Sequence, residues 1–550
     1  MIENKNEKPR AATLGTKPSH FIDAKKQFST SDCKAIAETN QSENWSDKEF
    51  SEPLCEYEAS TIDSSENKEV CLETDGSNAF SDVAQAIQSD AIAILGSNPK
   101  RQHSQVFEDI LNNLSEVDFR AFADIPSDRP VPQKVQIVVV IQEVLRTARN
   151  LNCRLCRKGD FIYAYNGEFW KIIEKPELES FLGEAAERLG VVWTDARYHR
   201  MRAELVKQFF VDANLPTAPK RNEEVLINLR NGTFVFSKTE PVLRDFNSDD
   251  FLTYQLPFEY DPEAEFSKWQ KFLDKVIPDK LRQLVLAQYL GYVFARHLKL
   301  EKTLILYGSG ANGKSVVFDV VRALLGEENV SEVSLEAISN SDYYRALLAN
   351  KLLNYSPEIS NRVQPDKFKQ LTSGEPIQAR LPYGQPMILR DYARLAFNTN
   401  DLPVDVEHSE AFFRRFLIIP FDVTIPSNER DPMFAKKIIE SELSGVFNWV
   451  LTGLKSLLEN NSFVSCEASD RLLESFRRES DSVAMFLEDE GYQKSLEYHI
   501  RLSDLYRGYR EYCLENGYRP LSQKKMSKRL SYLDYATEKL SIGKVVYLQR

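Results

Sequence analysis

Residues 303–326 read TLILYGSGANGKSVVFDVVRALLG, and they decide the fold of the central part of the chain. Thr303–Tyr307 is a short apolar run that predicts a buried strand, and the apolar spacing in 316–325 predicts a helix that ends at Gly326. Between them, Gly308–Ser315 matches the pattern G-x-x-x-x-G-K-[ST]. A strand, a glycine-rich loop and a helix in this order predict a phosphate-binding loop in an α/β domain with a parallel sheet.

Each residue type in this loop suits one task in holding a nucleotide. Glycines let backbone N–H groups curl around a phosphate, and the start of the helix adds positive potential. A lysine reaches the β- and γ-phosphates, and a serine hydroxyl binds Mg²⁺. The alternative, a glycine-rich turn without a ligand, does not explain why Lys and Ser open the helix. We therefore expect ATP and Mg²⁺ as cofactors, bound through Gly308, Gly310, Asn312, Gly313, Lys314 and Ser315.

Two further strands of the same domain lead to candidate catalytic residues. Residues 351–355 predict a strand followed by Glu358, which we expect to activate the attacking water and to contact Mg²⁺. Residues 393–397 predict a strand followed by Asn400, whose amide can sense the γ-phosphate. Each has a plain alternative, since a Glu in a surface loop and an Asn in a turn are both common.

An arginine pair precedes the last predicted strand of this domain. Arg414 and Arg415 stand directly before the apolar run Phe416–Pro420. An arginine stabilises the charge on a transferring phosphoryl group, and it often comes from a neighbouring subunit. The alternative is a solvated pair at the edge of a strand.

Composition divides the rest of the chain into regions around this domain. The 550 residues carry 70 Lys and Arg against 82 Asp and Glu, a net charge of −12, which excludes a uniformly basic nucleic-acid-coating protein. We expect an acidic disordered tail over 1–100, because so polar a segment cannot bury enough apolar surface to fold. A mixed α/β domain follows over 101–265, the P-loop domain with helical flanks over 266–480, and a basic domain over 481–550.

Local patterns predict several elements outside the P-loop. Apolar residues spaced three and four apart predict helices over 106–117 and 134–148, and helical spacing returns over 269–297 and 432–480. Asn166-Gly167 and Asn231-Gly232 each lie between alternating apolar runs, and this dipeptide accepts positive φ at both central turn positions. Each dipeptide therefore predicts a β-hairpin.

The last 50 residues reverse the overall charge. Residues 501–550 hold eleven Lys and Arg against five Asp and Glu, a local excess of +6. A helix with a cationic face suits contacts to DNA phosphates, although a merely solvated face is the alternative. The candidate DNA-binding residues on this helix are Lys524, Lys525, Lys528 and Arg529.

Other classes of site are disfavoured. Cys153 and Cys156 have the spacing of zinc ligands, but no second Cys pair or near His pair accompanies them. Glu116 and Asp118 could form the acidic pair of a primase metal site, but a primase domain needs well over about 100 ordered residues. No run of about 18 apolar residues and no signal peptide is present, so we expect a cytoplasmic protein without membrane contact.

These motifs together resemble a superfamily III helicase of the phage and plasmid primase–helicase family, which includes the poxvirus primase–helicase. The resemblance rests on the loop Gly308–Ser315, on FKQLTSGEPIQARLPYGQP with the later TNDLP, and on the arginine pair before Phe416–Pro420. Upstream, FIYAYNGEFWKII and LGYVFAR are similar to the domain that precedes the motor in this family. The resemblance implies an AAA+-like P-loop ATPase, a mixed α/β domain before it and a winged-helix-like domain after it, without a primase domain.

The same resemblance implies roles for single residues. Lys314 and Ser315 would bind nucleotide and Mg²⁺, Glu358 would be the second-motif acid, Asn400 the sensor, and Arg414 or Arg415 the arginine finger. The sequence departs from the family at two places. Ser356-Pro357 stands where a second acid is common, and a DNA-gripping hairpin with Arg380 and Tyr383 near its tip lacks the usual Lys.

The resemblance further implies a ring-forming, ATP-dependent DNA helicase for replication of a phage, plasmid or integrated mobile element in a bacterial host. We expect DNA, further copies of this chain in a homohexamer, and replication proteins of the host or element as partners. An ATP-regulated DNA-binding initiator is the main alternative. A small-molecule kinase is a third reading, but it explains neither the basic end of the chain nor the arginine pair.

Overall fold

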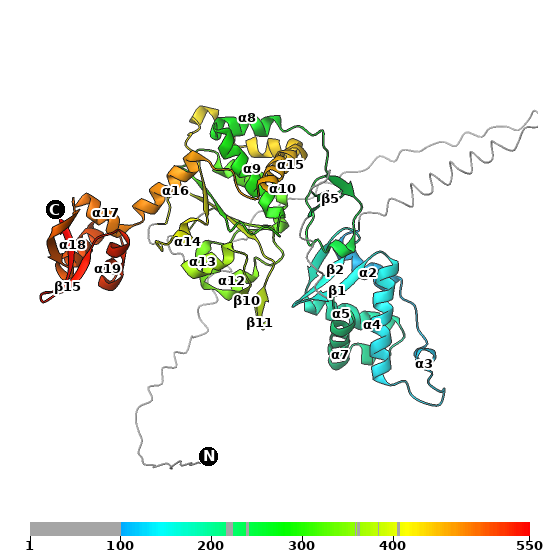
Figure 1. The fold of residues 1–550 in the computed structure, drawn as a ribbon. Helices are drawn as coiled ribbons and strands as arrows, with labels where there is room; N and C mark the ends of the chain where they lie inside the picture. Colours follow the sequence, from blue (N-terminus) through cyan, green and yellow to red (C-terminus); the bar gives the residue numbers. More distant parts are fainter. Residues whose placement is uncertain are drawn as a thin grey trace, which may run out of the picture. The chain divides into compact units, whose positions relative to one another are not determined.

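The computed structural model describes residues 101–215, 224–237, 241–357, 359, 364–382, 384–403 and 407–550. None of the helices in these ranges is long and apolar enough to cross a membrane. Groups of helices and groups of strands follow one another along the described residues (Figure 1). The predicted tail over 1–100 lies outside the described residues.

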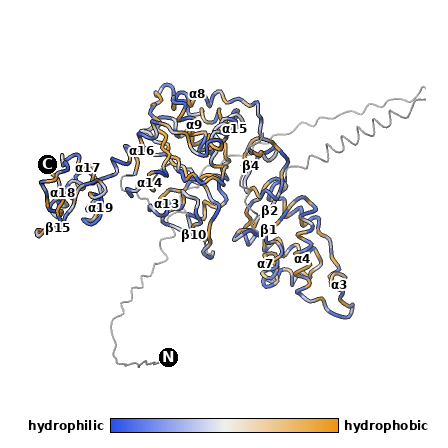
Figure 2. The backbone as a smooth tube through the Cα atoms, viewed as in Figure 1, coloured by the Kyte–Doolittle hydropathy of each residue, from blue (hydrophilic) through white to orange (hydrophobic). Residues whose placement is uncertain are grey.

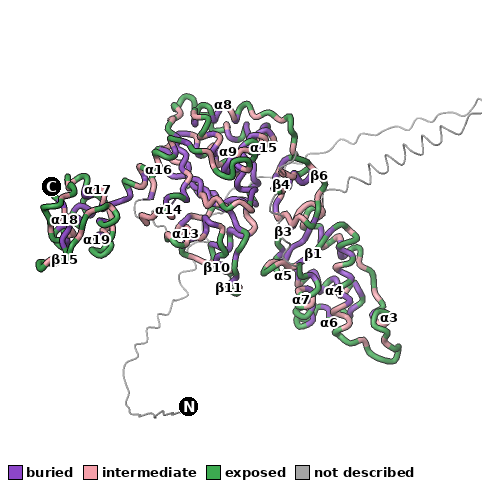
Figure 3. The backbone as a smooth tube through the Cα atoms, viewed as in Figure 1, coloured by how far each residue is buried: buried purple, intermediate pink, exposed green. Residues whose placement is uncertain are grey.

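The first described region combines helices with a small antiparallel sheet. Its helices are α2 (His103–Asn112), α3 (Phe119–Phe122), α4 (Gln133–Asn150), α5 (Lys175–Arg188), α6 (Trp193–Ala196) and α7 (His199–Asp212). Its strands β1 (Arg154–Lys158), β2 (Phe161–Tyr165) and β3 (Trp170–Ile173) pair in that order. Val140 and Val144 of α4 share one core with Leu182 of α5 and Leu205 of α7. The chain around α3 is mostly exposed (Figure 3).

A second antiparallel sheet follows and packs against the next region. It consists of β4 (Val225–Leu229), β5 (Gly232–Phe236) and β6 (Val242–Arg244). Ile227 and Phe234 of this sheet are buried in the same core as Tyr289 and Leu290 of the following helices. The sheet therefore belongs structurally with the P-loop region.

The P-loop region is built on a five-stranded parallel sheet. Its strands, in spatial order, are β13 (Phe416–Pro420), β7 (Thr303–Tyr307), β12 (Arg394–Thr399), β9 (Leu353–Ser356) and β8 (Val330–Ser331). Every neighbouring pair in this sheet is parallel. This is the fold class that the strand–loop–helix motif predicts, an α/β domain with a parallel sheet.

Helices cover both faces of this sheet. Leu304 and Leu306 of β7 face one core, and Ile305 between them faces the other. The first core includes α8 (Ser267–Val276), α9 (Lys280–Phe294), α10 (Lys314–Leu325) and α15 (Phe434–Asn460). The second includes α11 (Leu335–Asn340), α12 (Asp342–Ala346), α13 (Pro365–Thr372), α14 (Glu410–Phe413) and α16 (Glu467–Glu479). Hydrophobic residues accordingly gather inside, around α9 and the strands (Figure 2).

Between β9 and β12 the chain forms a hairpin. Its strands are β10 (Ile377–Arg380) and β11 (Pro386–Leu389), which pair antiparallel. Ala379 and Met387 are buried, whereas Leu381 and Ile388 are 41% and 54% exposed. The hairpin therefore has one face on the core and apolar side chains at its surface.

The last region combines three helices with a three-stranded sheet. The helices are α17 (Ser482–Asp489), α18 (Leu502–Glu515) and α19 (Gln523–Tyr532). The strands β14 (Gln493–Arg501), β16 (Gly543–Gln549) and β15 (Thr537–Leu540) form an antiparallel sheet in that spatial order. Phe486, Tyr509, Met526 and Val546 belong to one core, which is separate from that of the P-loop region.

Several boundaries differ from the predicted ones. α2 ends at Asn112, so it does not extend to Val117 as its apolar spacing suggested. The helical stretches 269–297 and 432–480 each divide into two helices, at Pro278 and Asp279 and at 461–466. Both predicted hairpins exist, but their turns differ from the predicted one. The first loop spans 166–169, and the second consists of Arg230 and Asn231, since Leu229 pairs with Gly232.

Candidate functional site

The P-loop follows β7 at the carboxyl edge of the parallel sheet. Gly308 leaves no room for a side chain, since a Cβ there would lie 2.1 Å from the Asn312 amide nitrogen. Gly313 has φ +88°, where a Cβ would lie 2.9 Å from the Phe272 ring. Gly310 also has a positive φ of +106°. The loop thus adopts a curled backbone that its glycines permit, and it delivers Lys314 to the first position of α10.

Oxygen atoms of the chain surround the Lys314 ammonium group. Its Nζ donates to the Gly308 carbonyl at 2.5 Å, to Asn312 Oδ1 at 3.1 Å and to Asn400 Oδ1 at 3.2 Å. Burial lowers the pKa of Lys314. A phosphate oxygen would give this partly buried cation the counter-charge that these neutral oxygens do not supply.

Asn312 is held from the other side of the loop. Its side chain is buried, and its Nδ2 donates to the Phe421 carbonyl at 3.1 Å. The Ala311 carbonyl accepts from the Ile425 amide at 2.8 Å. The segment after β13 therefore fixes the shape of the P-loop. Ser315, the next helical residue, is exposed, and its hydroxyl has no hydrogen-bond partner among the described residues.

Asn400 reaches Lys314 because β12 lies beside β7. Thr399 at the end of β12 pairs with Tyr307 at the end of β7, so both strands finish at the same edge. Thr399 also accepts a hydrogen bond from the Gly308 amide through its carbonyl, at 3.2 Å. Two residues that lie 86 positions apart in sequence thus meet at one site.

Glu358, the predicted water-activating acid, lies outside the described residues. β9 ends at Ser356, which pairs with Phe397 of β12. The buried Tyr355 donates its hydroxyl proton to Asn398 Oδ1 at 2.9 Å, which ties β9 to β12. The role of Glu358 stays a prediction.

The arginine pair lies at the opposite edge of the sheet from the P-loop. Phe416, which follows the pair, pairs with Thr303 at the start of β7, and the Arg415 carbonyl accepts from the Thr303 amide at 2.8 Å. The P-loop begins after Tyr307, four residues further along β7, which is about 13 Å at the rise of an extended strand. One chain therefore does not bring Arg414 or Arg415 to its own P-loop.

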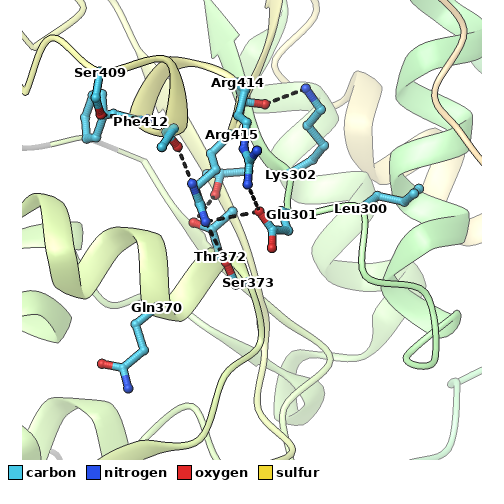
Figure 4. A network of polar contacts seen from close by, with 12 residues as sticks. Leu300, Glu301, Lys302, Gln370, Thr372, Ser373, Ser409, Phe412, Arg414 and Arg415 are labelled. Atoms are coloured by element: carbon cyan, nitrogen blue, oxygen red, sulfur yellow. Dashed lines mark hydrogen bonds and ion pairs between the residues drawn. The ribbon is translucent and has the colours of Figure 1, made fainter.

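The two arginines differ in their surroundings (Figure 4). The Arg415 side chain is 8% exposed, donates to Ser373 Oγ at 2.8 Å and contacts Glu301 at 3.0 Å. The Arg414 side chain is 56% exposed and shares the same Glu301 carboxylate at 2.9 Å. Lys302 donates to the Arg414 carbonyl at 2.6 Å. Arg415 is thus embedded in its own chain, whereas Arg414 faces outward. The sequence alone did not reveal Glu301 as their common partner.

The β10–β11 hairpin carries Arg380, whose Nε donates to the Gly384 carbonyl at 2.9 Å. Its guanidinium lies 5.9 Å from the ring centroid of Tyr343 on α12. Tyr343 and Tyr344 are 48% and 49% exposed. An arginine and exposed aromatic rings therefore lie side by side near the hairpin. Tyr383, predicted at its tip, lies outside the described residues.

A groove of about 990 Å³ in the last region collects basic residues. Lys524, Lys525 and Lys528 of α19 line it. Arg501 at the end of β14 and Lys544 of β16 also line it, although no sequence motif points to these two residues. None of these five side chains forms an ion pair with a described residue, so all five charges face the groove uncompensated.

Arg529 lies differently from the three lysines of its helix. Its Nε and Nη2 atoms bond to the Asp481 carboxylate at 2.7 and 2.6 Å. The Asp481 side chain is 3% exposed, and it also caps the start of α17. Arg529 therefore compensates a buried charge inside the domain.

Comparison with known proteins gives matches over most of the described chain. Residues 142–278 match the family model "D5 N terminal like", and residues 478–535 match "Poxvirus D5 protein-like". Residues 306–415, which contain the P-loop, match a family of unknown function, DUF5906.

Individual proteins are more distant. "Putative helicase L207/L206" of Acanthamoeba polyphaga mimivirus is 26% identical over 208 residues, which are 36% of this chain and 22% of that one. Two apo structures of the NrS-1 C-terminal region cover 74% and 75% of this chain and 98% and 100% of theirs. They are 13% and 12% identical, with TM-scores of 0.42 and 0.45. Segments that match D5-type family models therefore lie on both sides of the P-loop, which agrees with the resemblance of the sequence motifs to superfamily III primase–helicases.

Proposed function

We propose that this protein is an ATP-dependent DNA helicase whose motor is an AAA+-like ring of six copies of the chain. The observation that carries the proposal is the separation of the phosphate-binding residues from the arginine pair. Lys314 and Asn400 meet at the carboxyl edge of the sheet, and Arg414 lies at the amino edge. A motor of this kind needs the arginine of the neighbouring copy to complete each ATP site.

In the proposed reaction, Lys314 neutralises charge on the β- and γ-phosphates of ATP. Asn400 releases Lys314 and turns its amide toward the γ-phosphate or the attacking water. Glu358 accepts a proton from that water as the water attacks phosphorus and ADP leaves. Arg414 of the neighbouring copy stabilises the charge on the transferring group.

The Ser315 hydroxyl is the proposed Mg²⁺ ligand. It is a hard oxygen donor at the start of α10, exposed and not engaged by any described residue. When bound, Mg²⁺ would neutralise phosphate charge. Ser356 and Pro357, which precede Glu358, offer no second carboxylate, so water and phosphate oxygens would complete its coordination.

Two surfaces support DNA as the substrate. Arg380 beside Tyr343 offers a cation and an aromatic face near the β10–β11 hairpin, which suits a strand with unpaired bases. The groove on the last region offers α19 and the β15–β16 hairpin to a duplex, as a winged-helix domain does. Its lysines would bind phosphates, which is a sequence-independent contact. We assign the protein to DNA replication of a mobile element in the host cytoplasm, where further replication proteins would act with it.

The decisive experiment measures ATP hydrolysis with and without single-stranded DNA, together with the mass of the particle. We expect DNA-stimulated turnover by a particle of about six chains, and no turnover for Lys314→Ala. Hydrolysis that persists in Lys314→Ala would refute the nucleotide site. A monomer that turns over ATP at full rate would refute the ring.

A DNA-binding initiator is the second candidate, because the basic groove lies in a region with its own core, apart from the P-loop. Such a protein would use ATP to assemble on DNA without separating its strands. Strand displacement on a forked duplex separates the two functions. Stable DNA binding and ATP hydrolysis without displacement would favour the initiator.

A further inference from the structure

The helical region before the P-loop exposes a tryptophan. Trp193 opens α6 and is 60% exposed, and Tyr198 five residues later is 46% exposed. The Arg197 guanidinium lies 5.7 Å from the centroid of the Trp193 ring. Trp170, Trp269 and Trp449 are each no more than 8% exposed. Trp193 is thus the exposed tryptophan of the described residues, and its ring is available to a ligand.

A cavity of about 550 Å³ adjoins this ring, because Arg197 also lines it. The other lining residues are Ser180, Glu184, Glu187, Arg188 and Arg202. Arg188 contacts Glu184 at 3.1 Å, and Arg197 contacts Glu187 at 3.1 Å. These two arginines are therefore already compensated by carboxylates of α5.

Arg202 is the cation of this cavity that lacks a counter-charge. It forms no ion pair with any described residue, and its Nε is shielded from solvent without an acceptor. Gly183 makes room for it, since a Cβ at that position would lie 2.6 Å from the Arg202 Nε. A glycine on α5 thus lets an uncompensated guanidinium fit beside the cavity, where an anion would be stabilised.

The net charge of the cavity lining also favours an anionic ligand. The charged side chains that line the cavity are three arginines and two glutamates, so one positive charge is left over. An aromatic face beside excess arginine suits a base with its phosphate. A protein partner would also accept Trp and Arg, but it leaves the lone charge of Arg202 unexplained.

We propose that Trp193 and the adjoining cavity form a binding site for single-stranded DNA, separate from the P-loop and from the basic groove. One base stacks on the Trp193 ring, and the neighbouring phosphate takes Arg202 as its counter-ion, with Arg197 between them. The choice of DNA among polyanions rests on the proposed function. The site would hold the strand on the region that precedes the motor.

The test uses the full chain and a thymidine oligonucleotide. We expect the oligonucleotide to quench tryptophan emission, and Trp193→Phe to lose this quenching while it retains most of the affinity. Trp193→Ala should weaken binding about 10-fold, the range of one base–aromatic stack. Arg202→Gln should weaken binding and lower the salt dependence by about one phosphate contact, and Arg202→Lys should restore part of both.

Phe122→Ala is the matched control, because Phe122 is another exposed aromatic residue, at 55%, on a different helix of the same region. DNA affinity unchanged in both Trp193→Ala and Arg202→Gln would overturn this site alone. If Trp193→Ala changes the particle mass and leaves DNA affinity intact, the DNA site is also overturned, because that result identifies a protein interface. A wild-type chain that binds no oligonucleotide would overturn the proposed function as well.

Discussion

Replacing Arg414 by alanine should separate catalysis from folding. The Arg414 side chain is 56% exposed, and its pair with Glu301 is one that Arg415 also makes. Loss of an exposed ion pair changes the free energy of unfolding by about 1 kcal/mol or less. Loss of an arginine finger lowers turnover about 10³-fold or more, which corresponds to about 4 kcal/mol in the activation barrier. Arg414→Ala should therefore fold, bind nucleotide and fail to hydrolyse it.

Arg415→Ala is the matched comparison and should behave differently. The Arg415 side chain is 8% exposed, and it contacts Glu301, the Ser373 hydroxyl and the Ala411 carbonyl. Glu301 is 31% exposed and keeps its pair with Arg414, so the main loss is that of the buried hydrogen bonds of Arg415, which costs about 1–3 kcal/mol. This variant should lose stability first, and any loss of turnover should follow its unfolding.

The assay combines denaturant unfolding, nucleotide binding and steady-state hydrolysis for both variants. Mixing Arg414→Ala with Lys314→Ala should restore some hydrolysis, since an intact P-loop of the first can then meet an intact Arg414 of the second. If Arg414→Ala hydrolyses ATP at the normal rate, Arg414 is not the finger. If it is inactive and mixing restores nothing, the inference that the arginine acts on a neighbouring copy is refuted.

Four further variants test other parts of the structure. Asn400→Ala should retain nucleotide binding but hydrolyse ATP about 10²-fold more slowly, because it removes one polar group that would contact the reacting phosphate. Equal single-turnover rates for this variant and the wild type would contradict the role. Neutralising Lys524, Lys525 and Lys528 together should flatten the salt dependence of DNA binding by about one unit of slope per lost phosphate contact, and an unchanged slope would show that these lysines are only solvated. Arg529→Gln should instead destabilise the last region, because it leaves the buried Asp481 carboxylate without a counter-charge. His103 is partly buried against Phe169, and desolvation lowers its pKa from 6.5 to about 4. The unfolded chain therefore binds the proton first, and the free energy of unfolding should fall by about 3 kcal/mol as pH drops from 6.5 to 4. His103→Gln should remove most of this pH dependence, and an unchanged pH profile of unfolding would contradict it.

The sequence predicted those elements whose signal is local. The strand Phe416–Pro420 and the end of α10 before Gly326 are confirmed, because an apolar run and a helix-ending glycine determine them. The end of α2 was wrong by about one turn. The side chain of Asp118 caps the next helix by accepting from the Arg120 and Ala121 amides, which competes with continued helical spacing.

Turn positions were also harder to predict, because side-chain hydrogen bonds decide them. Asn166 does not occupy the positive-φ position of a two-residue turn. Its side chain accepts hydrogen bonds from the amides of Glu168 and Phe169, which stabilises a longer loop. Such side-chain bonds depend on how the two strands meet, and a dipeptide preference does not contain that information.

The residues of the candidate site likewise fall into those that the sequence predicted and those that it did not. The P-loop is a continuous motif, so its residues were found directly, and Asn400 was found because parallel strands end at one edge. Glu301, Arg501 and Lys544 were missed because each lies far in sequence from the residues that it joins. Arg529 was grouped with its helical neighbours because spacing alone does not reveal the buried Asp481 opposite it.

Strand β12 connects the β10–β11 hairpin with Asn400 beside the P-loop. Its six residues run from Arg394, shortly after the β10–β11 hairpin, to Thr399, beside Asn400. A strand of that length spans about 17 Å, and as an interior strand it is clamped by β7 and β9. Such a strand would therefore move as one rigid unit. A nucleotide that pulls on Asn400 would draw the hairpin segment at the far end in the same direction, so binding and hydrolysis at the P-loop would move the surface that the hairpin presents.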